Sequence, residues 1–321
     1  MSGKLKLFGT VSRAEFILPN LGSLILGLAW GANRTLSLAS LVTLLILSFM
    51  IINLSSAIGA QVNTYSDYEL DTKDERKKQL VQAVDSFGKN HIKQAIVIEL
   101  ICALVLVSVF AYELGKPLLF VLWVIGISLG CAYSAPPLRL KARSWLAPAS
   151  LFLVLAIFPV LFAYYSFTSV IEPLFIASLA GLTLTIYGVI VPTETRDYFG
   201  DKAMGIETLT VHLGLAKASF AAIILLAAGA ILTTTSFLLK FIYDNHGLLS
   251  LPLILVLVVV IYVLGQFRKL HRLSSEYARS GQASVADEIT TLSANNPRWI
   301  MFVTQTYSFI SIILLLSKFL L

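Results

Sequence analysis

The chain has 321 residues, of which 57% are hydrophobic and only 13% are charged. An ordinary soluble domain carries about 25% charged residues, so this composition excludes that class. The net charge of +6 calls for no nucleic-acid partner, because membrane proteins gather Lys and Arg on one side of the bilayer. The sequence therefore predicts an all-α, multi-pass membrane protein.

Nine apolar stretches are long enough to span a bilayer as helices. They lie near residues 14–32, 36–60, 93–113, 117–134, 146–167, 171–192, 216–240, 247–266 and 299–320. No Pro/Gly/Ser-rich linker separates them, so residues 1–321 are expected to form a single domain. We predict about nine transmembrane helices around a central cavity.

The distribution of basic residues predicts the orientation of these helices. The N-terminus and the loops after the second, fourth, sixth and eighth stretches hold 20 of the 24 Lys and Arg residues. The positive-inside rule places these segments in the cytoplasm and the protein in the cell membrane. Three polar loops, 63–92, 133–145 and 193–215, are expected to cap the cavity on that side. The polar stretch 268–298 is interpreted as a solvated connector.

Two short acidic segments, 63–71 and 194–201, adjoin apolar stretches. Their aspartates are Asp67 and Asp71 in the first segment and Asp197 and Asp201 in the second. A spacing of four residues places two side chains on one face of a helix. Mg²⁺ is usually held by one or two carboxylates plus the phosphates of a substrate. One such pair alone is typical of solvated helix-end charges, whereas two matched pairs favour a Mg²⁺ site for a diphosphate at the membrane surface.

The two segments resemble the paired signature of the UbiA superfamily of intramembrane prenyltransferases. The resemblance extends to Tyr133-Ser-Ala-Pro-Pro-Leu-Arg-Leu-Lys141 after the fourth stretch and to residues 201–214 after the second acidic segment. The Tyr133–Lys141 segment is most similar to that of chlorophyll synthases, although neither acidic motif copies theirs. Glu194 stands where many members have Asp or Asn, and Lys78-Gln79 replaces the usual Arg-Pro.

The resemblance implies Mg²⁺-dependent transfer of a prenyl group from a polyprenyl diphosphate to a lipophilic or aromatic acceptor in the membrane, with release of diphosphate. The four aspartates are the expected catalytic residues. The expected metal ligands are Asn63, Asp67, Asp71, Glu194, Asp197 and Asp201. The expected diphosphate contacts are Asn63, Tyr133, Arg139, Lys141, Lys78 and Arg196, with Lys77 as a further candidate.

Other interpretations of the same residues remain. Each basic residue taken alone could equally be a positive-inside residue that contacts anionic lipid. A membrane terpene cyclase would use the same diphosphate site without an external acceptor. A small-molecule transporter would place its polar site near the bilayer midplane, whereas these aspartates gather at one surface. A non-catalytic scaffold would not require matched acidic pairs.

Overall fold

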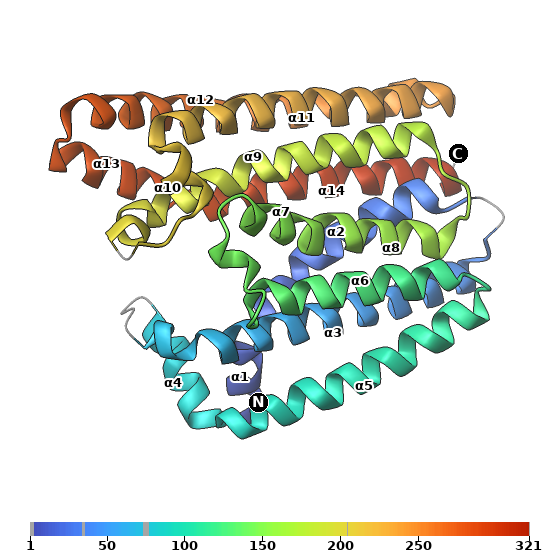
Figure 1. Cartoon of the computed structure of the whole chain (residues 1–321). Helices are drawn as coiled ribbons and strands as arrows, with labels where there is room; N and C mark the ends of the chain where they lie inside the picture. Colours follow the sequence, from blue (N-terminus) through green and yellow to red (C-terminus); the bar gives the residue numbers. More distant parts are fainter. Residues whose placement is uncertain (1–2, 34–35, 73–76, 204, 321) are drawn as a thin grey trace.

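The computed structural model describes residues 3–33, 36–72, 77–203 and 205–320. Within these ranges the regular elements are helices, and one isolated parallel bridge joins Ser144 to Thr208. Long helices lie side by side in an elongated bundle (Figure 1). This arrangement confirms the predicted all-α fold.

The first half of the bundle contains six helices. They are α1 (Gly3–Val11), α2 (Ile17–Gly31), α3 (Leu38–Asp71), α4 (Lys78–Phe87), α5 (Lys89–Glu113) and α6 (Pro117–Ser134). The second half follows a short 3₁₀ turn, η3 (Leu140–Ala142). Its elements are α7 (Leu146–Phe152), the π-helical turn η4 (Leu153–Ile157), α8 (Phe158–Phe167), α9 (Pro173–Ala203), α10 (Leu209–Leu213), α11 (Leu215–Tyr243), α12 (Leu253–Ser280), α13 (Ala283–Ser293) and α14 (Asn296–Leu320).

Each of the nine predicted stretches contains a helix, but not every helix has the length of a full span. In the described part of the chain, 7 helices are long and apolar enough to cross a membrane. An eighth span is possible in α9, where Pro173–Val189 and Glu194–Ala203 meet at 49°. The apolar part of α2, Asn20–Gly31, is shorter than these spans. A multi-pass membrane protein is therefore confirmed, whereas the count of nine stays a prediction.

The outer surface of the bundle is apolar. Ile98 of α5, Ile231 of α11 and Ile261 of α12 are 61%, 68% and 67% exposed. Large apolar patches of this kind are unfavourable in water and are covered by lipid in membrane proteins. The long helices satisfy their own backbone hydrogen bonds, as the hydrocarbon region requires.

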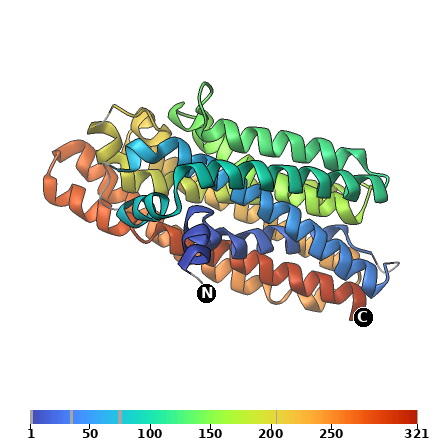
Figure 2. The ribbon, with the colours of Figure 1, turned by 90° about the horizontal axis from the view of Figure 1, so that it is seen from below.

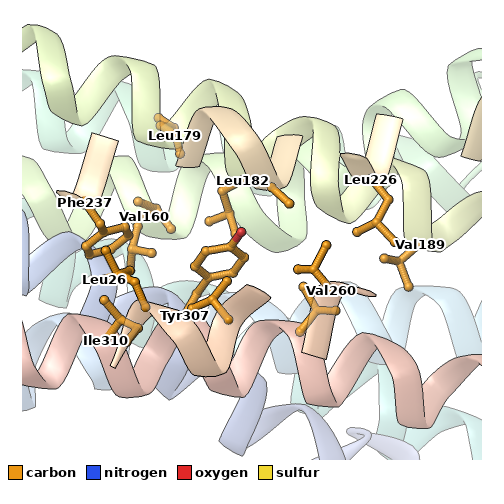
Figure 3. Packing of buried hydrophobic residues seen from close by; sticks show 14 of the residues in the cluster. Leu26, Val160, Leu179, Leu182, Val189, Leu226, Phe237, Val260, Tyr307 and Ile310 are labelled. Carbon is orange, nitrogen blue, oxygen red and sulfur yellow. The ribbon is translucent and has the colours of Figure 1, made fainter. Parts of the chain in front are cut away.

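Two buried clusters hold the bundle together and meet along the α2–α8 pair. One cluster joins α2 and α8 to α9, α11, α12 and α14, and Figure 3 shows Tyr307 of α14 at its centre, near Leu182 of α9. The other joins α2 and α8 to α3, α5 and α6. At the contact between them, a Cβ added to Gly27 would lie 2.6 Å from the Val160 carbonyl oxygen. A glycine at this position therefore allows the two halves to approach closely.

The polar segments at one end of the bundle contain more helix than the sequence predicts. α3 continues to Asp71 and α9 to Ala203, so much of the expected loops 63–92 and 193–215 is helical. Residues 73–76 of the first loop lie outside the described ranges. The interpretation of 268–298 as a solvated connector is wrong, because α12 and α13 bury Leu270 and Ile289 completely. α4, α10 and α13 all lie at this end in both views of the bundle (Figures 1 and 2).

Candidate active site

The first acidic pair occupies the last two turns of α3. The buried positions of this helix include Ile58, Gln61, Thr64, Asp67 and Asp71, with the three- and four-residue spacing of one helix face. This register turns the two aspartates toward the protein interior, where each is only 5% exposed. Burying an ionised carboxylate is unfavourable unless it is paired. The two aspartates therefore require cationic partners.

Three basic residues provide those partners. Arg139 Nη2 lies 3.3 Å from Asp67 Oδ1, and Lys141 Nζ donates a hydrogen bond to Asp67 Oδ2. Lys77 Nζ lies 2.6 Å from Asp71 Oδ1. The structure thus gathers the predicted Asp67, Arg139 and Lys141. It brings Lys77 to Asp71, whereas Lys78 is exposed at the start of α4.

The segment between α6 and α7 directs both basic side chains. The Pro136-Pro137 peptide bond is cis, and Arg139 adopts a left-handed backbone with φ of 38°. A non-glycine residue in this region costs about 1–3 kcal/mol and often marks a functional site. Burial lowers the pKa of Lys141; the Asp67 carboxylate opposes this shift, and the Arg139 and Lys77 cations reinforce it. Several positive charges are therefore concentrated beside the first acidic pair.

The second acidic segment lies beyond the bend of α9. Arg196 forms two hydrogen bonds to the carboxylate of Asp197, at 3.2 and 2.9 Å. One carboxylate oxygen of Glu194 accepts hydrogen bonds from the backbone N–H and the hydroxyl of Thr210, both at 3.0 Å. Glu194 thereby fixes the start of α10 and lies within electrostatic range of Asp201. Sequence analysis did not anticipate this role of Thr210.

Tyr133 lies near both acidic segments. It lies in the last turn of α6 and is within electrostatic range of both Glu194 and Asp67. The bridge between Ser144 and Thr208 joins the segments that follow α6 and α9. Asn63, half-buried, lies one helical turn before Asp67. The two distant parts of the sequence therefore meet at one end of the bundle.

The donor set fits a divalent cation that shares its ligands with a phosphate. Among the described residues, no three His, Cys, Asp or Glu side chains form a group that could hold a metal ion by themselves. Mg²⁺ rarely uses such an all-protein cage and usually combines one or two carboxylates with substrate phosphates. Two buried aspartates beside three cations meet that requirement, because the cations match the charge of a phosphate group.

Solved structures with the same fold span nearly the whole chain. A digeranylgeranylglyceryl phosphate synthase aligns with a TM-score of 0.63 at 18% identity, covering 96% of this chain and 99% of that protein. A UbiA homologue from Archaeoglobus fulgidus bound to GPP and Mg²⁺ aligns with a TM-score of 0.61 at 17% identity, covering 93% and 99%. The same homologue bound to DMAPP and Mg²⁺ gives the same values. A comparison with curated proteins finds no match.

The family assignment comes from the sequence itself. The model of the UbiA prenyltransferase family matches residues 20–281, a range that includes both acidic segments and the Tyr133–Lys141 segment. This range covers most of the chain and agrees with the fold of the solved relatives. The protein is a membrane prenyltransferase and belongs to the UbiA prenyltransferase family.

Proposed function

We propose that this prenyltransferase transfers the prenyl group of a polyprenyl diphosphate to a lipophilic or aromatic acceptor within the membrane, with Mg²⁺ as cofactor. One observation carries the proposal: Asp67, buried at the end of a transmembrane helix, is already paired with two cations from another segment, Arg139 and Lys141. Acidic and basic groups side by side are what a metal-bound diphosphate requires.

The basic residues bind the donor. In the free protein Arg139, Lys141 and Lys77 neutralise the buried aspartates. When a diphosphate enters with its metal ion, these cations exchange a carboxylate partner for phosphate oxygens. Arg139 suits this exchange because its planar guanidinium can bind two phosphate oxygens at once. Arg196 at the second segment and Lys78 on α4 are further candidates for diphosphate contacts.

The acidic residues would hold the metal ion. Asp67 and Asp71 would form one side of the site, Asp197 and Asp201 the other, and Asn63 and Glu194 would add a ligand to each. When bound, Mg²⁺ neutralises the negative charge that develops on the departing diphosphate oxygen. Tyr133, within electrostatic range of Asp67 and Glu194, is placed to orient a phosphate or the acceptor through its hydroxyl.

The proposed reaction balances without a further co-reactant. The bond between the allylic carbon and the diphosphate oxygen breaks, and its electron pair leaves with diphosphate. A carbon or oxygen nucleophile of the acceptor forms the new bond and releases a proton. The prenyl chain lies among apolar helices, where each buried methylene contributes about 0.8 kcal/mol.

The proposed site faces the cytoplasm at the cell membrane. The support is the distribution of charge, because 20 of the 24 Lys and Arg residues lie at the N-terminus or in segments at the end of the bundle that carries the aspartates. Asp85 of α4 is exposed at this end of the bundle. A cysteine introduced there by Asp85→Cys should react with a membrane-impermeant thiol reagent only from the cytoplasmic side.

Product analysis tests the proposal. Purified protein is incubated with Mg²⁺, with geranyl, farnesyl or geranylgeranyl diphosphate, and with one acceptor class at a time: aromatic quinone precursors, a chlorophyllide-like macrocycle, glycerol-phosphate lipids or carotenoids. Prenylated product and an equal amount of diphosphate are expected for one class. A cyclised hydrocarbon formed without acceptor would instead identify a terpene cyclase, and Mg²⁺-independent turnover would contradict the proposed cofactor.

A further inference from the structure

The second acidic pair lies on a helical segment that is not coaxial with the transmembrane part of α9. Asp197 and Asp201 belong to Glu194–Ala203, which is bent by 49° from Pro173–Val189. Residues 190–193 lie between the two parts, so the axis of the transmembrane part does not set the direction of Glu194–Ala203. Contacts outside α9 must therefore fix the direction of this segment.

The contacts come from a buried cluster that includes α12 and α13. We call it the α13 cluster, and its buried members are Tyr198, Leu215, Leu270, Leu273, Val285 and Ile289. Ile289 of α13 and Leu270 of α12 are 0% exposed, and Tyr198 is 7% exposed. Phe199 extends the contact, because its ring lies edge-on to Tyr277 of α12 at 5.2 Å. α9 is thus packed against the hairpin just where its aspartates lie.

Tyr198 transmits this packing to the acidic pair. It follows Asp197 directly, so its side chain is rotated by about 100° from that of Asp197 around the helix. The ring is buried in the α13 cluster while the carboxylate pairs with Arg196. At the equivalent place after Asp67, Tyr68 is only half-buried and its hydroxyl donates to Asp85 at 2.6 Å. Packing thus orients the second pair, whereas cations from other segments bind the first.

We infer that the α12–α13 hairpin, residues 268–293, is a positioning element for the second acidic pair, with Tyr198 and Ile289 as its positioning residues. The inference rests on the proposed function, in which Asp197 and Asp201 complete the metal and diphosphate site. The hairpin acts through the backbone of Glu194–Ala203 and touches neither metal nor substrate.

Two substitutions that create cavities of the same size in different clusters test the inference. Ile289 and Ile310 are both 0% exposed, but Ile310 lies on α14 in the large cluster of the transmembrane bundle. Ile289→Ala and Ile310→Ala should lower the unfolding temperature by similar amounts. Only Ile289→Ala should speed hydrogen exchange in residues 194–203. It should also raise the Mg²⁺ concentration for half-maximal diphosphate release by about tenfold, because loss of a residue that supports metal ligands from outside weakens metal binding by about this factor.

Conservative variants separate positioning from general damage. Ile289→Val and Tyr198→Phe keep the packing and should restore both readouts, whereas Tyr198→Ala should not. If Ile289→Ala does not fold, Val285→Ala makes a smaller cavity in the same cluster. The inference would be overturned if both isoleucine variants increased the hydrogen-exchange rate of residues 194–203 equally. It would also be overturned if neither variant changed that rate. Absence of Mg²⁺-dependent release from the parent protein would reject the proposed function instead, and the exchange comparison would still decide the role of the hairpin.

Discussion

Lys141 donates a hydrogen bond to Asp67 from 74 residues further along the sequence, and both side chains are largely buried. The same carboxylate also pairs with Arg139. Such an arrangement places the cations that we propose to bind diphosphate beside the expected metal ligands before any substrate is present. Little reorganisation is then needed when a charged donor enters, which is the usual source of electrostatic catalysis.

Removal of the Asp67 charge should abolish most activity. Asp67→Asn keeps the shape of the side chain but leaves Arg139 and Lys141 without their counter-charge and removes a proposed metal ligand. Diphosphate release should fall by about 100-fold or more, as for loss of other preorganised electrostatic groups. Glu69→Gln is the matched control, because Glu69 is exposed on the same helix. Near-parental release by Asp67→Asn would remove this residue from the proposed site.

The lowered pKa of Lys141 predicts a pH dependence of donor binding. Lys141 loses its proton at a lower pH than a surface lysine, so the KM for the prenyl diphosphate should rise as pH increases through that range. Lys141→Arg keeps the charge and should flatten this alkaline limb, whereas Lys141→Gln should show the high KM at every pH. KM is measured against pH for all three proteins.

Unfolding of the protein would not explain such a rise of KM with pH. A lysine whose pKa is lower in the folded state binds fewer protons there than in the unfolded state, so its contribution favours folding as pH rises. The unfolding temperature should therefore not fall over the pH range in which KM rises. A fall of the unfolding temperature that accompanies the rise of KM would contradict the assignment to Lys141.

The sequence predicted the shared helix face of the first acidic pair because local rules govern it. The four-residue spacing of Asp67 and Asp71 fixes their shared helix face, and helix geometry is independent of the rest of the fold. Arg139 and Lys141 were predicted through their family resemblance. The sequence did not distinguish Lys77 from Lys78, because the choice depends on where α4 begins, and helix ends are the least certain feature of a sequence reading.

Other features depend on tertiary packing that no local pattern reveals. Segment 268–298 has the polar composition of a connector, yet Leu270 and Ile289 are buried because α13 folds back on α9. Glu99 of α5 is a carboxylate inside a predicted span, and Gln61 of α3 donates to both of its oxygens at 3.1 and 3.0 Å. An ionisable group within a transmembrane helix needs such a partner, and only the fold shows which residue provides it.

Because α9 packs closely against α11, one methyl group added to α9 at this contact should destabilise the protein. A Cβ added to Gly188 would lie 2.7 Å from the backbone nitrogen of Leu226 and 3.0 Å from the Ala222 carbonyl oxygen. Overpacking of this kind costs about 1–3 kcal/mol. Gly188→Ala should therefore lower the unfolding temperature. Gly265→Ala on α12, where the added Cβ meets nothing within 4 Å, should not, and equal effects would contradict the close contact.

A buried ion pair at the opposite end of the bundle should support stability without affecting catalysis. Lys240 at the end of α11 has a side chain 9% exposed and lies 2.7 Å from Glu172 and 3.1 Å from Asp244. Lys240→Met removes the cation that pairs with both carboxylates, which costs about 3–5 kcal/mol for a buried pair. The measurement is unfolding in detergent by denaturant, with kcat for diphosphate release recorded at a temperature where each variant is folded.

The double variant Lys240→Met with Glu172→Gln tests whether the loss is electrostatic. Removing the second charge eliminates the uncompensated Glu172 carboxylate, so part of the lost stability should return, although Asp244 still lacks its partner. Because Lys240 lies at the far end of α11 from Leu215 and the acidic segments, kcat should stay near that of the parent in both variants (Figure 1). Additive losses in the double variant would mean that Lys240 stabilises the bundle by packing of its aliphatic chain rather than by its charge.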